Sequence, residues 1–196
     1  MTNNASPPPL EGGGWGEGCV QPTAAAVRTP PPNPLPQGEG EHLAGAHLRL
    51  VIGVGNPDRG DDGIGRLVAR RLRDSVPAEV RIEEQDGAAA PLIESLRDAG
   101  SVWLIDAAVS GALPGTIRRT DCNATDALPA RSGASSHGLG LAEAVALART
   151  LHGLPRVCIL YAVEGVTFAP GAAMTPQVLA AADTVIALLA EEMLSD

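Results

Sequence analysis

Hydrophobic and polar positions alternate with two different periods along residues 48–196. Short apolar runs rich in Val and Ile predict buried strands, and apolar residues repeated every three or four positions predict amphipathic helices. The predicted strands are 48–54, 80–85, 101–107, 115–119 and 156–163, and the predicted helices are 64–72, 89–99, 141–152 and a last one that starts at Pro176. This order predicts a three-layer α/β/α sandwich with a largely parallel twisted sheet.

Residues 1–47 lack both patterns and contain two Pro-rich stretches that each run into Gly and Glu residues. Such a segment buries too little apolar surface to offset its ordering entropy, which predicts a disordered tail. A Pro-rich docking ligand and a non-native start of the chain are the two other interpretations. The predicted organisation is therefore a tail at 1–47 and one α/β domain at 48–196.

The loop between the first strand and the first helix reads GNPDRGDDG at 55–63. Gly53 and Gly55 fit the start of a dinucleotide-binding fingerprint, but its third glycine is replaced by Asp58, whose charge would repel a pyrophosphate. Asp61 and Asp62 stand just before the helix, where a carboxylate can cap the free N–H groups. Capping needs only one of them, so the second acid predicts a metal ligand or an acid–base group.

Two further polar residues are predicted at the same edge of the sheet as Asp62. Asp106 ends the third strand with no helix directly after it, and His137 stands just ahead of the helix at 141–152. Ligands of α/β sheets bind beyond the carboxyl ends of the strands. Two carboxylates and an imidazole suit a divalent cation such as Ni²⁺, Zn²⁺ or Mn²⁺, with positions left for water or substrate. An acid–base site without metal is the alternative.

Composition narrows the classes of function. The net charge of −9 disfavours nucleic acid or an anionic membrane as a partner. Cys19, Cys122 and Cys158 form no CxxC pair, so neither a disulfide framework nor a zinc site is expected. No stretch approaches the ~20 apolar residues of a membrane span, and the first residues lack the features of a signal peptide. We therefore expect a cytoplasmic protein. All 14 basic residues are Arg, which we attribute to codon usage.

Three motifs follow one another in the predicted domain. They are GVGNPDRGDDGIG at 53–65, LIDA at 104–107 and SHGLGLAEAV at 136–145, with the weaker segments QDGAAA at 85–90 and VEGVTFAPGAAMTPQV at 163–178. In this order they resemble the hydrogenase maturation proteases, endopeptidases that trim the C-terminal tail of the [NiFe]-hydrogenase large subunit after nickel insertion. The resemblance extends from Leu50 to about Leu189.

The resemblance implies roles for the polar residues named above. Asp62, Asp106 and His137 match the family's metal-contacting residues, and they would contact nickel carried by the precursor. Nickel is then a recognition element delivered with the substrate. Asp61 is a possible orienting residue or proton acceptor beside this site.

The implied function is an endopeptidase that removes the C-terminal extension of a [NiFe]-hydrogenase large-subunit precursor. That precursor is the expected partner, and we expect the chain to act as a monomer. The alternative is a non-catalytic nickel-sensing maturation chaperone or checkpoint on the same fold, which would need the same three residues. Cleavage of a nickel-loaded precursor distinguishes the two.

Overall fold

The computed structural model of the chain describes residues 48–73, 75–125, 128 and 140–195. These residues form a five-stranded sheet with the strand order β2-β1-β3-β5-β4. The strands are β1 (Arg49–Val54), β2 (Val80–Gln85), β3 (Ser101–Ala108), β4 (Ile117–Asp121) and β5 (Val157–Glu164). All neighbouring pairs are parallel except β4 with β5, which is antiparallel. The prediction of a largely parallel sheet is confirmed.

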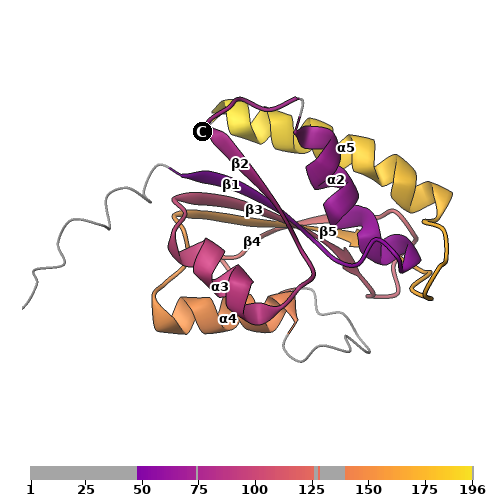
Figure 1. The fold of residues 1–196 in the computed structure, drawn as a ribbon, viewed down its shortest axis with the longest axis horizontal. Coiled ribbons are helices and arrows are strands. Elements are labelled where there is room, and N and C mark those ends of the chain that lie inside the picture. Colours follow the sequence, from indigo (N-terminus) through magenta and orange to yellow (C-terminus); the bar gives the residue numbers. More distant parts are fainter. Residues whose placement is uncertain (1–47, 74, 126–127, 129–139, 196) are drawn as a thin grey trace, which may run out of the picture. The chain divides into compact units, whose positions relative to one another are not determined.

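Helices cover both faces of this sheet (Figure 1). A short 3₁₀ helix, η1 (Gly60–Gly63), leads into α2 (Ile64–Leu72), and the later helices are α3 (Ala89–Arg97), α4 (Leu141–Leu151) and α5 (Pro176–Ser195). α2 and α5 lie on one face, and α3 and α4 lie on the other. The predicted three-layer α/β/α sandwich is therefore confirmed.

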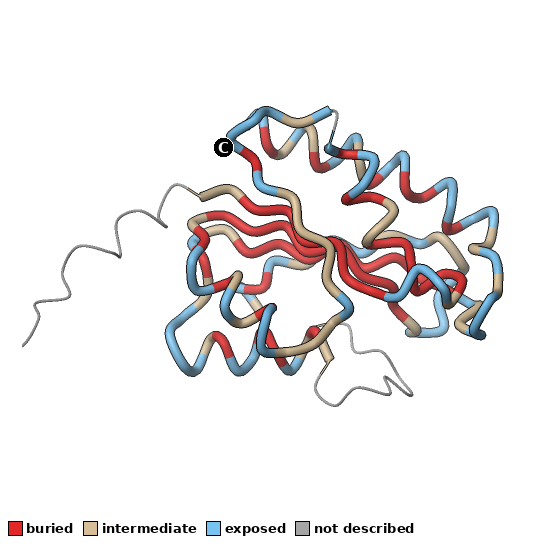
Figure 2. The backbone as a smooth tube through the Cα atoms, in the orientation of Figure 1, coloured by how far each residue is buried: buried red, intermediate tan, exposed pale blue. Residues whose placement is uncertain are grey.

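Each face of the sheet packs its own set of apolar side chains. In β3, Val102 and Leu104 pack with residues of α3 and α4, whereas Trp103 and Ile105 pack with residues of α2 and α5. This alternation follows from the period of two along a strand. Because helices cover both faces, the central strands are buried along their length (Figure 2). That double burial explains why these strands are continuous apolar runs in the sequence.

The strand register brings the carboxyl ends of the parallel strands to one edge. Val54 of β1 pairs with Gln85 of β2, and Ala108 of β3 pairs with Glu164 of β5. The loop at 55–63 follows β1, and the segments at 109–116 and 165–175 follow β3 and β5. These three connections therefore share the edge at which an α/β sheet binds ligands.

Some details differ from the sequence-based expectations. β3 continues to Ala108, so Asp106 lies within the strand, and β4 begins two residues later than predicted. The sequence also predicts an approximate apolar stripe of Leu141, Val145, Ala148 and Leu151 on the last-but-one helix. Leu151 is the last residue of α4 and is 63% exposed, so it does not belong to the buried face. The tail predicted at 1–47 lies outside the described residues.

No helix in the part of the chain that the structure describes has the length and apolarity needed to cross a bilayer.

Candidate functional site

The first loop folds back against the end of β1. Gly55 has a φ of +128°, a positive value that favours glycine, and its N–H donates to the Gln85 carbonyl at 3.0 Å. A Cβ at this position would overlap the carbonyl oxygen of Asp62 and lie 3.3 Å from the Asp62 Oδ1 atom. The glycine thus allows the loop to place Asp62 directly against the carboxyl end of β1.

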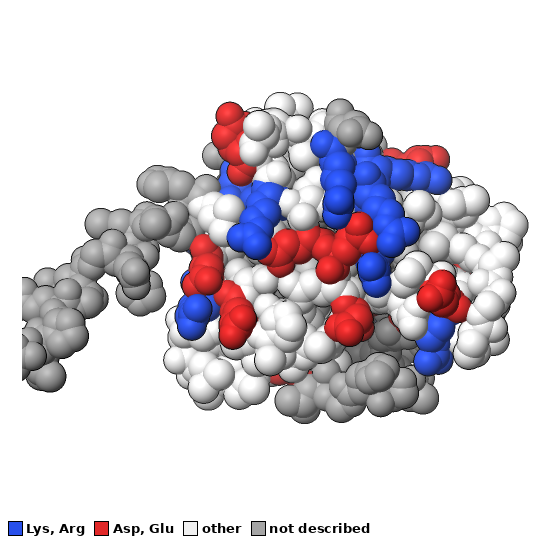
Figure 3. Space-filling model, viewed as in Figure 1, with Lys and Arg blue, Asp and Glu red and all other residues white. Residues whose placement is uncertain are grey.

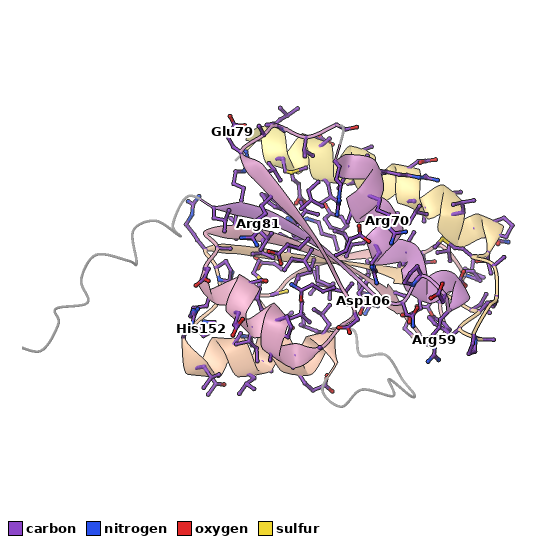
Figure 4. All side chains as sticks on the ribbon, in the orientation of Figure 1. Arg59, Arg70, Glu79, Arg81, Asp106 and His152 are labelled. Atoms are coloured by element: carbon purple, nitrogen blue, oxygen red, sulfur yellow. The ribbon has the colours of Figure 1, made fainter. Side chains whose placement is uncertain are left out.

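The start of α2 is in close contact with the two central strands. A Cβ on Gly65 would overlap the carbonyl oxygens of Val54 and Ile105. Ile105 directly precedes Asp106, and Gly65 stands about one helical turn after Asp62. Figure 4 shows Asp106 at the end of the sheet from which α2 starts. The structure therefore brings Asp62 and Asp106 to the same edge, and each is only 5% exposed.

Asp106 belongs to the α3/α4 face of the sheet. The alternation along β3 places it on the side of Leu104 and Ala108, which pack with α3 and α4. Its Oδ1 accepts a hydrogen bond from the Ala107 N–H at 2.8 Å. α4 covers this face and begins at Leu141, close in sequence to His137. Asp106 thus lies on the face of the sheet that α4 covers.

His137 itself lies outside the described residues. Within the ranges that are described, no three His, Cys, Asp or Glu side chains come together as a group of metal ligands. The structure thus places two members of the predicted set at one edge, and the third member stays a prediction. Carboxylate oxygens with an imidazole remain a donor set that suits nickel.

Asp61 has a different role from its neighbour. Its Oδ1 accepts a hydrogen bond from the Thr175 N–H at 2.6 Å, and its Oδ2 accepts from the Val166 and Thr167 N–H groups, both at 2.9 Å. Both oxygens of Asp61 are thus bound to residues after β5 and not to the start of α2, so the interpretation of Asp61 as a cap of this helix is wrong. Asp61 instead joins the first loop to the segment that follows β5.

The environment of Asp61 also changes its acidity. Burial alone would raise the pKa of this carboxyl, but the hydrogen bonds from Thr175, Val166 and Thr167 outweigh it and hold the pKa below its ordinary value. A carboxylate with a lowered pKa is a weaker base. This favours the orienting role of Asp61, which fixes the loop carrying Asp62, over the role of proton acceptor.

A second buried acid fixes the connection after β3. Glu164, at the end of β5, accepts hydrogen bonds from the Ser110 N–H at 2.7 Å, the Gly111 N–H at 2.8 Å and the Ser110 hydroxyl at 2.8 Å. Burial would raise the pKa of Glu164, but these donors hold it below the ordinary value of 4.5. Glu164 therefore fixes the start of the connection at 109–116, at the edge of the sheet that carries Asp62 and Asp106.

We expect Glu164→Gln to lower the free energy of unfolding by about 2 kcal/mol at pH 7, because hydrogen bonds to a charged acceptor are replaced by neutral ones. The pKa of Glu164 is lowered in the folded state, so its contribution is complete above pH 4.5 and is lost as the pH falls below that value. Urea unfolding at several pH values measures this. The gap between wild type and variant should shrink below pH 4.5, with exposed Glu79→Gln as the control. A gap that stays constant would contradict the assignment.

An α/β/α sandwich with buried acids at the carboxyl edge of a parallel sheet is the framework of many ligand- and metal-binding α/β proteins. Comparison with known proteins narrows this class. The sequence profile of the hydrogenase maturation proteases matches residues 68–192. The matched stretch contains Asp106 and His137, whereas Asp61 and Asp62 precede it. The chain belongs to the hydrogenase maturation protease family.

Individual relatives agree with this assignment. The chain is 30% identical over 135 residues, 66% of its length, to the hydrogenase expression/formation protein HupD of Thiocapsa roseopersicina, and it spans 60% of that protein's length. It is 29% identical to the hydrogenase maturating endopeptidase HybD of E. coli, with a TM-score of 0.57 and coverage of 74% of this chain and 94% of that one. The [NiFe] hydrogenase maturation protease HycI of Thermococcus kodakarensis is 25% identical, with a TM-score of 0.56 and coverage of 74% and 91%. The expected enzyme class, a peptide hydrolase, is the class of this family.

Proposed function

We propose that this chain is an endopeptidase that removes the C-terminal extension of a [NiFe]-hydrogenase large-subunit precursor after nickel has been inserted. Membership of the maturation protease family supports the processing of a hydrogenase precursor. The observation that carries the finer proposal is the pair of nearly buried carboxylates, Asp62 and Asp106, at the carboxyl edge of the sheet.

In this proposal nickel arrives as part of the substrate. Asp62 and Asp106 offer oxygen ligands and His137 offers an imidazole nitrogen, a set that suits the ion. An ion in this position would supply Lewis-acid polarisation of the scissile carbonyl or of a water. The protein's own part is to bind and orient the precursor. A precursor without nickel lacks the group that these side chains recognise, and it is spared.

The fixed geometry of the two acids supports this role. Asp62 lies on a loop that is tied to the rest of the fold at two points, through Gly55 against β1 and through Asp61 against residues 166–175. Asp106 lies inside a fully buried strand. These two backbone segments are held by the fold before a ligand arrives, so the two acids lose little entropy on binding.

A processing assay tests the proposal. The full-length protein is mixed with nickel-loaded and with nickel-free precursor, and the mass of the precursor is followed. We expect a short C-terminal peptide to be lost only from the nickel-loaded form. Nickel-dependent binding without cleavage would instead support the checkpoint function. Equal cleavage of both forms would contradict the role of nickel as recognition element.

A further inference from the structure

The exposed side of α2 carries three arginines that converge on one acid. Arg66, Arg70 and Arg73, which we call the arginine ridge, follow one another at the i, i+4 and i+7 spacing of a single helix face. The Nε atoms of Arg66 and Arg70 lie 3.0 and 2.8 Å from Glu84 Oε2, and an Nη atom of Arg73 lies 2.9 Å from Glu84 Oε1. Figure 3 shows basic side chains gathered over α2, above a row of acidic side chains.

The charges within this cluster do not balance. Among the residues that the structure describes, three guanidinium groups share the single carboxylate of Glu84, which balances only one of their three positive charges. The neighbouring acid on β2, Glu83, is already engaged by Arg81 at 2.9 Å. Burial would raise the pKa of Glu84, but Arg66 and Arg70 outweigh it and hold the pKa below its ordinary value, so this carboxylate is ionised near neutral pH.

The ridge is both ordered and accessible. The Glu84 side chain is only 13% exposed, and its carboxylate forms ion pairs that fix the three guanidinium groups. The side chains of Arg70 and Arg73 are 50% and 53% exposed. A guanidinium has five donor N–H groups in a rigid fork that matches a carboxylate. Arginines that are already ordered lose less conformational entropy when they bind an anion.

The position of the ridge relates it to the site. Arg66 is one helical turn after Asp62, and the seven-residue step to Arg73 extends about 10 Å along α2. Figure 4 shows Arg70 on α2 beyond the end at which Asp106 lies. A protein bound along the ridge would therefore extend toward the carboxyl edge of the sheet, at which the two acids lie.

We infer that the arginine ridge is a docking site for an acidic surface of the precursor protein. The inference rests on the proposed function, and it adds a contact outside the site itself. The chain as a whole carries a net charge of −9, so an acidic partner is repelled by most of this molecule and attracted at the ridge. The resulting electrostatic field favours one orientation of the partner and accelerates its association. Added salt screens the field and weakens both effects. The same net charge disfavours nucleic acid, the other common polyanion.

The test compares two double variants that remove the same number of charges. Arg70→Gln with Arg73→Gln removes two ridge arginines and leaves Arg66 on Glu84. The control, Arg71→Gln with Arg97→Gln, removes two exposed arginines that each pair with one acid, Asp183 at 2.6 Å and Asp98 at 3.0 Å. Thermal unfolding checks that both variants fold.

The measured quantities are the KM and kcat for nickel-loaded precursor and the Kd for the same precursor, each at low and at high salt. We expect the ridge variant to raise KM and Kd by about tenfold at low salt with kcat unchanged, and by less than about twofold at 0.5 M salt. The control should change them less than about twofold at both. Equal effects of the two variants would overturn the inference.

Two other outcomes are also decisive. If the wild-type protein does not cleave, the proposed function fails, and the Kd comparison alone decides whether the ridge binds the precursor. A DNA duplex serves as the second probe in the binding assay. Ridge-dependent binding of the duplex, together with ridge-independent binding of the precursor, would replace the acidic protein partner with nucleic acid.

Discussion

Asp106→Asn is expected to abolish processing of the nickel-loaded precursor and to leave the fold intact. The asparagine has the same shape and can still accept the hydrogen bond from the Ala107 N–H, so β3 should keep its structure. What is lost is a negatively charged oxygen ligand at the edge of the sheet. If that ligand stabilises the transition state of cleavage by about 4 kcal/mol, its loss slows processing by about a thousandfold.

The same result is expected for Asp62→Ala, Asp106→Ala and His137→Ala, since the proposal assigns all three residues to one ion. The readout is the mass of the precursor after incubation, together with the Kd for nickel-loaded precursor. Thermal unfolding of each variant shows whether the fold is kept. Glu94→Ala, which removes an exposed acid from α3, is the control and should process normally. If all three site variants process at the wild-type rate, the assigned site is wrong.

Asp61 and Asp62 show what the sequence can and cannot predict about such a site. The sequence predicts that one acid of the pair is structural and that the other is a metal ligand or an acid–base group, but for Asp61 it proposes the wrong structural partner. Asp61 binds the N–H groups of Val166, Thr167 and Thr175, more than 100 residues away. A helix cap is a local contact and can be predicted from neighbouring residues, whereas this contact exists only after the two segments have met in the fold.

The fold was easier to predict because its signals are local. Each buried strand is a continuous apolar run and each helix carries an apolar stripe, so the order of elements follows from the pattern alone. The placement of Asp106 followed from one further rule, that parallel strands end at a common edge. The antiparallel direction of β4 has no such signal, because a five-residue edge strand without a fully buried position carries little pattern.

The arginine ridge was missed for another reason. An all-Arg set of basic residues is attributed to codon usage, and that interpretation predicts no site at any of them. The i, i+4, i+7 spacing of Arg66, Arg70 and Arg73 was visible in the sequence. The partner that organises them, Glu84 on β2, became evident only from the packing of α2 beside that strand.

Gly65→Ala is expected to lower the free energy of unfolding by about 2–3 kcal/mol, although alanine is the better helix former by about 1 kcal/mol. The added Cβ would overlap the carbonyl oxygens of Val54 and Ile105 and lie 2.6 Å from the Val54 nitrogen. All three are backbone atoms of central strands and cannot rotate away. The start of α2 must therefore lift from the sheet, which strains the contact between α2 and the two central strands.

Thermal and urea unfolding measure this loss, which corresponds to roughly 5–10 °C in melting temperature for a domain of this size. Gly140→Ala is the control, since Gly140 has a φ of −81° and the nearest atom to its added Cβ is the flexible end of Glu143 at 3.1 Å. It should change stability by less than about 1 kcal/mol, since the main cost is the loss of a glycine from the N-cap position of α4. Because Asp62 is carried by the turn that leads into α2, processing by Gly65→Ala should also fall at temperatures where the variant is fully folded. Normal processing by a destabilised variant would show that the position of Asp62 does not depend on the close packing of Gly65 against the central strands.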